Sequence, residues 1–315
     1  MPEPIVLLQQ LINGISRGSV YALIALGYTM VYGIIELINF AHGEVFMLGT
    51  FTAMSFVTVF GINDQNPILS DPVGLILVLI LTFLVTMISM GVLGVLIERA
   101  AYRPLRNAPR LAPLISAIGV SYILQNIGQV WKGPASLSFP RIMQDQLFRI
   151  PMGDRFLIIR SQAIVVLLVS IGFTVLLTLF VARTKLGKAM RATAQDQTTS
   201  QLMGINVNRT ISLTFFIGAA LAGAGAVLYG MFIQGTQFTL GNIVGLKAFT
   251  AAVLGGIGNI PGAVLGGYLI GVIESASDAF GGLSRWTNAI VFAVLILILV
   301  FRPSGLLGQQ VPEKV

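Results

Sequence analysis

The sequence predicts an all-α polytopic membrane protein with about eight transmembrane helices, one of them broken near 257–261. Two observations carry this prediction. Hydrophobic residues fill 55% of the 315 positions and charged residues only 10%, whereas a soluble domain carries roughly 25% charged residues. Apolar runs such as 75–96 and 163–181 also reach the ~20 residues that a helix needs to cross the hydrocarbon core.

Glycine, proline and charge clusters divide the chain into individual spans. No segment between them is long enough to fold alone, so we expect a single transmembrane domain over 1–315. The first four residues, MPEP, contain no basic residue, and we therefore expect no cleaved signal peptide. The expected spans are 7–33, 41–60, 73–98, 112–131, 162–182, 211–233, 244–280 (broken) and 286–301.

Basic residues indicate which side of the membrane each loop faces. The loops 99–110 and 183–210 are rich in arginine and lysine, and two spans separate them, so both lie on one side. The positive-inside rule makes that side cytoplasmic. The loop 132–161 must then be external; it is also basic, but it is longer and includes Asp145 and Asp154. The direction of the first span stays open, because few charges flank it.

Several classes of function lack the residues that they need. The sequence has no cysteine and one histidine, which excludes disulfides, thiolate chemistry and a multi-histidine metal site. It contains no GxxxxGK[ST], HExxH or GxSxG motif, so we expect neither an enzyme nor a bound cofactor. The net charge of +7 reflects the loops rather than a nucleic-acid partner, because no basic run is interleaved with aromatic residues.

The stretch "IELINFAHGEVFMLG" places four polar residues between apolar runs: Glu36, Asn39, His42 and Glu44. Ionisable groups inside a membrane are costly, by roughly 2.5–3.5 kcal/mol at a helix centre for Asp, Lys or Arg, and usually face a bundle interior or a watery path. Spacings of three residues put Glu36, Asn39 and His42 on one helix face. They either line a substrate pathway or cap the turn between the first two spans. Neither alternative requires proton chemistry.

The stretch "GGIGNIPGAVLGG" crowds glycines around Pro261 in the middle of apolar sequence. We expect the helix to break near 257–261, because glycine is permissive and proline lacks a donor. A break at membrane depth is tolerated only where protein or a water-filled cavity satisfies the freed backbone. A glycine follows Asn259 as one follows Asn39, which hints at paired interrupted units of the kind that mark transport pathways. Gly258 and Asn259 therefore join the pathway candidates.

Three further charges fall inside or beside apolar sequence. Glu274 and Asp278 are four residues apart, which fits either an external mouth reached by water or a solvated helix end. We expect Lys247, like the Glu98-Arg99 pair, to be interfacial, with its stem snorkelling to the headgroups.

The cytoplasmic stretch "RTKLGKAMRATAQDQTTSQLMGINVNRT" is too long for a tight connection. Its composition favours a helix as far as Gln195, and Gly204 is suited to end a helix as the chain turns back to the membrane. Small and apolar residues, among them Leu202 and Met203, lie beside basic flanks. The pattern fits either a short helix presented to a soluble partner or an amphipathic helix lying on headgroups.

Three motifs then carry a family resemblance. "NFAHGEVFMLG", "MRATAQDQTTSQLMGIN" followed by Arg209, and "GGIGNIPGAVLGG" together resemble the permeases of bacterial branched-chain amino acid ABC importers, and they match the shorter, LivH-type subunit best. The resemblance runs across essentially the whole chain.

The resemblance implies the ABC importer permease fold in a bacterial inner membrane. It also implies a homologous second permease, two cytoplasmic ATPase subunits and a periplasmic amino acid-binding protein. The cytoplasmic loop would carry a short helix that docks on an ATPase. The usual Glu-Ala-Ala opening of such loops is replaced here by Ala192-Thr193-Ala194. The candidate docking residues are Arg191, Ala192, Ala194, Asp196, Gly204 and Ile205.

On this resemblance, the residues at 36–44 would line or brace the path of branched-chain or related amino acids. Three alternatives stay open. The same superfamily includes urea and short-amide permeases. An ion-coupled secondary transporter would use Glu36, Glu44 or Glu274 as a carrier group. A structural membrane scaffold would need none of them. The pairing of two permeases as a homodimer or a heterodimer is also open.

Overall fold

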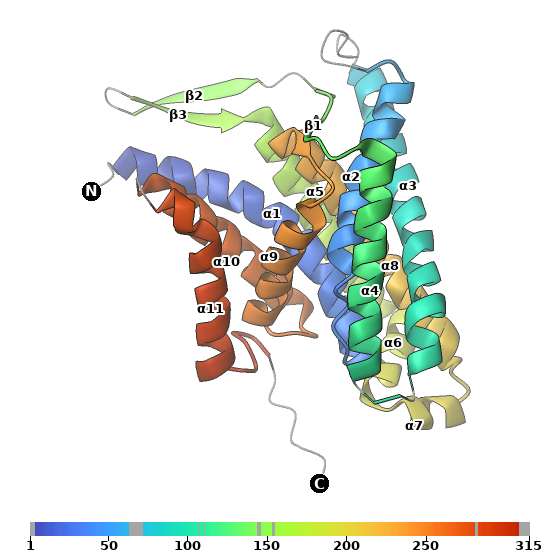
Figure 1. Ribbon diagram of the computed structural model, residues 1–315. Helices are drawn as coiled ribbons and strands as arrows, with labels where there is room; N and C mark the ends of the chain where they lie inside the picture. Colours follow the sequence, from blue (N-terminus) through green and yellow to red (C-terminus); the bar gives the residue numbers. More distant parts are fainter. Residues whose placement is uncertain are drawn as a thin grey trace.

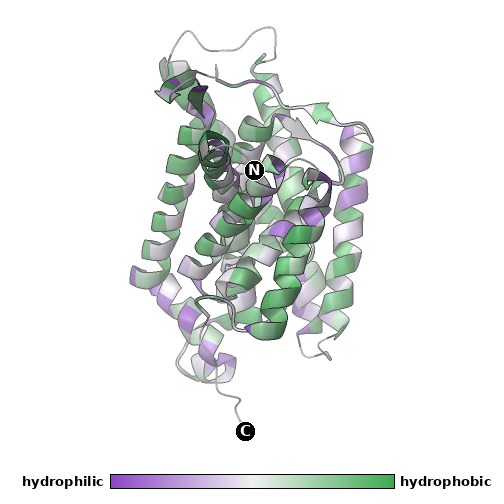
Figure 2. Ribbon diagram, turned by 90° about the vertical axis from the view of Figure 1, so that its left-hand side faces the viewer, coloured by the Kyte–Doolittle hydropathy of each residue, from purple (hydrophilic) through white to green (hydrophobic). Residues whose placement is uncertain are grey.

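The computed structural model describes residues 4–62, 72–106, 108–109, 111–143, 146–152, 155–280 and 283–308, and it is a bundle of long α-helices (Figure 1). Most residues along these helices are hydrophobic (Figure 2). The long helices are α1 (Pro4–Ile35), α2 (His42–Val59), α3 (Pro72–Ile97), α4 (Leu111–Lys132), α5 (Ser161–Arg183), α8 (Val207–Ile233), α9 (Leu240–Gly255), α10 (Ile260–Ala279) and α11 (Thr287–Phe301). Shorter elements are the π-helical turn Glu98–Tyr102, the 3-10 turns Arg103–Leu105 and Ser284–Trp286, α6 (Lys185–Gln195), α7 (Gln197–Leu202), and the strands β1 (Leu137–Ser138), β2 (Leu147–Met152), β3 (Arg155–Arg160) and β4 (Gly235–Thr236).

Seven helices in the described part of the chain are long and apolar enough to cross a membrane: α1, α3, α4, α5, α8, α10 and α11. The helix α2 forms where the second span was expected but is enclosed by protein. Thirteen of its 18 residues are buried, His42 and Glu44 among them. It packs on α8, α3, α9 and α4. Because neighbouring helices enclose most of α2, its polar residues His42, Glu44 and Thr50 do not face hydrocarbon.

Glycines allow α1 and α10 to touch backbone to backbone. A Cβ atom placed on Gly18 would lie 2.6 Å from the Cα atom of Tyr268, and one placed on Gly14 would lie 2.7 Å from that of Val272. Small residues at such contacts let transmembrane helices approach closely. This packing fixes α10, and with it the segment that precedes it, against the first helix.

The helix break is confirmed, and it lies at Gly256–Asn259, but its geometry differs from the expected one. The chain turns back at the break, so α9 and α10 are antiparallel partners and not two parts of one interrupted span. Gly255 faces Gly262 across this hairpin. The turn lies beside the last residues of α1, since a Cβ atom on Gly33 would be 3.6 Å from the Cα atom of Gly258. The break therefore sits at the end of the bundle that carries α6 and α7 (Figure 1), and not at mid-depth.

The expected external loop forms small β-structure at the opposite end of the bundle (Figure 1). The strands β2 and β3 make an antiparallel hairpin, and β1 pairs with β4. The Gln9 side chain of α1 tethers the hairpin by two bonds to the backbone of Ile158: its amide donates to the carbonyl oxygen at 2.8 Å and its Oε1 accepts from the backbone N–H at 2.8 Å. These strands were not predicted from the sequence.

Candidate functional site

Glu36, the first of the predicted polar residues, ends α1. It follows the last helical residue with a φ of 52°, and its N–H donates to the carbonyl of Tyr32 at 2.8 Å. A left-handed residue at this position is a common way for a helix to stop. The Glu36 side chain is exposed. It therefore does not join the buried residues that follow.

Asn39 braces the turn that leads into α2. Its side chain is buried, and its Oδ1 accepts hydrogen bonds from the N–H of Ala41 at 3.1 Å and from the Tyr102 hydroxyl at 3.0 Å. Its backbone carbonyl accepts from the N–H of His42 at 3.1 Å. Asn39 thus satisfies backbone groups at the turn and also ties α2 to the π-helical turn after α3.

His42 and Glu44 lie inside the bundle, each with 1% of its surface exposed. The His42 ring packs edge-on against Tyr28 of α1, with 4.6 Å between the ring centres. The Glu44 carboxyl lies against Gly241 in the first turn of α9, and the Ser121 hydroxyl of α4 approaches it. Among the described residues, His42 Nε2 and Glu44 Oε2 have no hydrogen-bond partner.

A small cavity of about 100 Å³ is lined by residues that these two side chains contact, Ser121 and Gly241 for Glu44 and Tyr28 for His42, although neither His42 nor Glu44 itself lines it. It is bounded by α1, α4, α9 and the turn before α2, and it combines hydroxyl groups with aliphatic and aromatic surface. Several residues on its rim are exposed, so it opens on the face of the bundle between α4 and α9. Its lining residues are Tyr28, Phe40, Ile118, Ser121, Tyr122, Gly241, Asn242, Gly245 and Leu246.

Gly258 and Asn259, the other pathway candidates, belong to the α9–α10 turn and do not line this cavity. Asn259 caps α10, because its Oδ1 accepts from the N–H of Gly262 at 2.9 Å, and its amide donates to the carbonyl of Leu307 at 2.7 Å. Gly258 is exposed, with a φ of 90°. The sequence placed these two residues in one pathway with residues 39–44, but the cavity beside Glu44 does not bring them together in the described structure.

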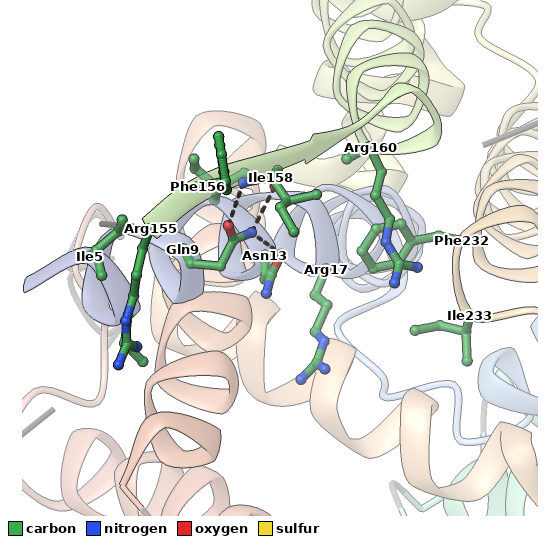
Figure 3. Close-up of a pocket in the computed structure, with 13 residues that line it drawn as sticks. Ile5, Gln9, Asn13, Arg17, Arg155, Phe156, Ile158, Arg160, Phe232 and Ile233 are labelled. Carbon is green, nitrogen blue, oxygen red and sulfur yellow. Dashed lines mark hydrogen bonds between the residues drawn. The ribbon is translucent and has the colours of Figure 1, made fainter. Parts of the chain in front are cut away.

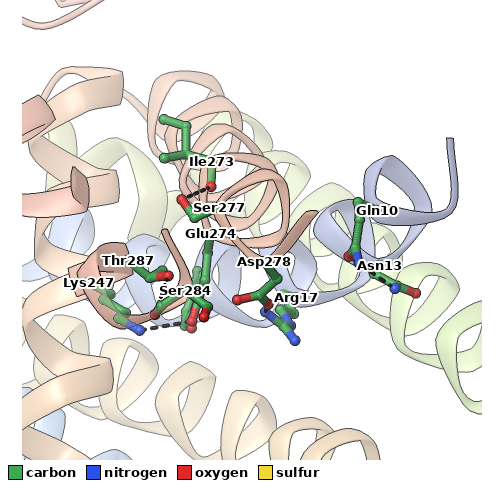
Figure 4. A network of polar contacts seen from close by, with 11 residues as sticks. Gln10, Asn13, Arg17, Lys247, Ile273, Glu274, Ser277, Asp278, Ser284 and Thr287 are labelled. Atoms are coloured by element: carbon green, nitrogen blue, oxygen red, sulfur yellow. Dashed lines mark hydrogen bonds and ion pairs between the residues drawn. The ribbon is translucent and has the colours of Figure 1, made fainter. Parts of the chain in front are cut away.

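A charged network inside the bundle was not foreseen (Figure 4). Lys247 donates to Glu274 at 2.8 Å, and the Tyr21 hydroxyl donates to the other carboxylate oxygen at 2.6 Å. Arg17 pairs with Asp278 at 2.7 Å nearer the helix ends. The expectation that Lys247 snorkels to the headgroups is wrong, because its side chain is buried and paired within the protein. Glu274 is likewise held by Lys247 and Tyr21 and is not an unpaired carboxylate at an external opening.

A second polar network lies where α3 ends. Glu98, also expected at the interface, is fully buried; it pairs with Arg106 and accepts from the Ser212 hydroxyl of α8 at 2.7 Å. Burial lowers the pKa of Arg106, and the negative charge of Glu98 opposes that shift. A cavity of about 370 Å³ beside this network reaches α7 through Gln197.

The cytoplasmic segment folds as two short helices, α6 and α7, with Asp196 between them. The Asp196 carboxylate caps α7 by accepting from the N–H of Thr198 at 2.8 Å, as aspartate commonly does at helix starts. Gly204, at φ 80°, ends the segment. The other docking candidates make contacts within this chain or are partly covered by it. Arg191 donates to the carbonyl of Val181, and the N–H of Ile205 donates to the carbonyl of Ser200. Ala192 is half-buried.

Ala194 packs against the hydrophobic core of the bundle. The most exposed large apolar side chains of this segment are Leu202 and Met203, at 84% and 78%, followed by Leu186 at 42%. Both side chains are far more exposed than Ala194, which is partly buried.

At the opposite end, a hollow of about 480 Å³ lies between α1 and the β2–β3 hairpin (Figure 3). Arg17, Arg155 and Arg160 line it together with Gln9 and Asn13. It shares no lining residue with the cavity beside Glu44.

Comparison with known proteins gives a consistent match. The family described as the permease component of branched-chain amino acid transport systems matches residues 10–300. The high-affinity branched-chain amino acid transport system permease protein BraD of Pseudomonas aeruginosa is 45% identical over 316 residues, covering 100% of both chains. The corresponding LivH of Escherichia coli is 42% identical, covering 98% of this chain and 97% of its own. A probable LivH of Methanocaldococcus jannaschii is 31% identical, covering 94% and 91%. No solved structure matches.

Proposed function

This chain belongs to the permease-component family of branched-chain amino acid transport systems, and from that premise we propose that it moves branched-chain amino acids across the bacterial inner membrane. It is a multi-pass membrane subunit and not itself an enzyme. Separate ATPase subunits would drive it and a periplasmic binding protein would feed it, because its sequence has no phosphate-binding loop of its own.

The observation that carries the proposal is the cavity beside Glu44. It combines three hydroxyl groups, those of Tyr28, Ser121 and Tyr122, with aliphatic surface, and two of its lining residues contact the buried carboxyl of Glu44. Amino acids need both polar and apolar contacts, and a permease fed by a binding protein needs no deep high-affinity site. The cavity opens between α4 and α9, the face that we assign to the second permease, whether that partner is a homologue or a second copy of this chain.

The cytoplasmic end supports the coupling role. The segment α6–α7 is anchored to the bundle on one side, since Gln197 donates to the carbonyl of Ile34 at 3.4 Å. Its outward face carries Leu202 and Met203. Closure of the ATPases would thus act on the end of α1 and on the nearby turn into α2, the helix that bears Glu44.

An ion-coupled carrier is supported less well by the described residues. Of its three candidate carboxylates, Glu36 is an exposed helix end and Glu274 is held by Lys247 and Tyr21. Only Glu44 has a buried carboxylate oxygen without a hydrogen-bond partner in the described part of the chain.

The test is uptake into proteoliposomes that contain this chain, the second permease and the ATPases. The binding protein is supplied on the side of the membrane that corresponds to the periplasm. We expect leucine uptake that requires ATP and persists when a protonophore collapses the pH gradient. Uptake by this chain alone, or uptake lost with the protonophore, would refute the proposal. Uptake of urea in place of leucine would favour the amide permease alternative.

A further inference from the structure

Glu44 is a buried carboxyl with one oxygen that lacks a hydrogen-bond partner. Its residue surface is 1% exposed, and Oε2 has no hydrogen-bond partner in the described part of the chain. The buried Lys247 and the half-buried Arg106 are paired elsewhere, Lys247 with Glu274 and Arg106 with Glu98. An unpaired carboxylate inside a membrane domain is costly. A cation that arrives and leaves would offset that cost only while it is bound.

The cavity next to Glu44 suits a small organic cation. Ser121 and Gly241, the two residues against which the carboxyl lies, are both part of its lining. Tyr28 and Tyr122 add aromatic rings to the same cavity, and aromatic rings attract ammonium groups. We propose that Glu44 receives the α-ammonium group of the amino acid in transit. This inference rests on the proposed function.

The remaining lining fits the other two parts of such a substrate. Gly241 and Asn242 lie in the first turn of α9. Backbone N–H groups at a helix start favour carboxylates, so this turn suits the carboxylate of the substrate. Ile118 and Leu246 on the rim offer aliphatic surface. A cavity of about 100 Å³ has room for the ammonium end, so the aliphatic side chain would extend along the rim toward the neighbouring subunit.

Two glycines make this arrangement possible. A Cβ atom on Gly241 would occupy the place of the Glu44 carboxyl, and one on Gly245 would lie 2.8 Å from the Cα atom of Gly43. The missing side chains on α9 let α2 approach and bring the carboxyl to the cavity wall. The competing explanation is that Glu44 merely complements the positive helix ends of α2 and α9. In that case no ligand would compete for its charge.

Thiol labelling separates the two explanations without depending on transport. The chain has no cysteine, so Ser121→Cys introduces the only thiol of this subunit, inside the cavity. The permease in its complex is treated with a cationic or an anionic methanethiosulfonate of similar size, with and without leucine. We expect the cationic reagent to react about tenfold faster than the anionic one, and leucine to slow it. In Ser121→Cys/Glu44→Gln, both the preference and the protection should disappear.

The control thiol is Ser284→Cys, which is exposed in the 3-10 turn after α10 and does not line the cavity; its labelling should not respond to Glu44→Gln or to leucine. Glu44→Asp, which keeps the charge, should keep the preference and serves if the Gln variant fails to insert. A charge preference that survives Glu44→Gln, or one that leucine leaves unchanged, overturns the inference. If the unmodified complex, reconstituted in the same way, then shows ATP-dependent leucine uptake, the proposed function still holds although the inference about Glu44 does not.

Discussion

At the residue scale, the molecule holds several charges inside the membrane domain by pairing them between distant helices. Lys247 and Glu274 are 27 residues apart, and Tyr21 reaches Glu274 across 253 residues. Sequence spacing shows only that Glu274 and Asp278 are neighbours on one helix. The pairing depends on how α1 packs on α9 and α10, which no local pattern specifies. Hence the snorkelling expected of Lys247 was wrong.

Breaking the Lys247–Glu274 pair on one side should destabilise the bundle. We expect Lys247→Met to lower the free energy of unfolding by roughly 3–5 kcal/mol, because it leaves a buried carboxylate without its cation. Lys247→Met/Glu274→Gln should recover most of that loss. The measurement is thermal unfolding of the purified protein in detergent.

Arg17→Gln is the matched comparison, since the Arg17–Asp278 pair is 29% and 33% exposed. It should cost at most ~1 kcal/mol, as exposed pairs do. Equal losses for Lys247→Met and Arg17→Gln would contradict the distinction between the two pairs.

A single hydrogen bond of Tyr102 gives a second residue-scale prediction. Tyr102→Phe should cost ~0.5–1.5 kcal/mol of stability, because it removes the buried bond to Asn39 while its ring still packs on Phe215. Tyr268→Phe is the control, a partly buried tyrosine for which the described structure shows no hydroxyl hydrogen bond. Indistinguishable unfolding temperatures for the two variants would show that the bond contributes nothing.

At the scale of elements, composition located the spans and the glycine-rich break well. The long apolar runs became α3, α5 and α11, and the chain does leave helical geometry at Gly256–Asn259. What composition could not supply is direction. A break of four residues allows the helix either to continue or to reverse, and the choice is made by Gly255, Gly262 and Gly266, which let α9 and α10 lie side by side. Periodicity likewise did not reveal that α2 is enclosed by other helices.

The exposed turn between α9 and α10 yields the element-scale prediction. Gly258 has a φ of 90°, and a Cβ atom there would meet nothing within 4 Å. Gly258→Ala and Gly258→Leu should therefore destabilise the hairpin to a similar degree, by ~1–3 kcal/mol, through backbone strain and not through bulk. The check is unfolding of both variants in detergent. A Leu variant much less stable than the Ala variant would show that the turn is covered.

At the scale of the whole molecule, the two ends of the helical bundle differ in the surface that they expose. The end with α6 and α7 presents apolar side chains on an exposed segment, and the opposite end presents the β2–β3 hairpin and an arginine-lined hollow. Basic loops predict that the end with α6 and α7 is cytoplasmic, and the family resemblance predicts that this segment contacts the ATPases. The particular contact residues depend on how α6 lies on the bundle. That packing turns Ala194 inward, so enlarging Ala194 would test the fold and not the docking.

The docking test belongs to Leu202 and Met203. If an ATPase groove receives them, Met203→Trp adds volume to a close-packed contact, at ~1–3 kcal/mol, and should reduce both co-purification of the ATPases and ATP-dependent uptake. Membrane insertion should be unchanged, because Met203 is 78% exposed and its enlargement meets no part of this chain's core. If the segment instead lies on headgroups, tryptophan is accepted readily, since it favours the membrane interface. Phe301→Trp, at the 81% exposed end of α11, controls for adding tryptophan at the same end of the bundle. Full ATPase association with Met203→Trp would rule out docking at this position and favour the headgroup-bound segment.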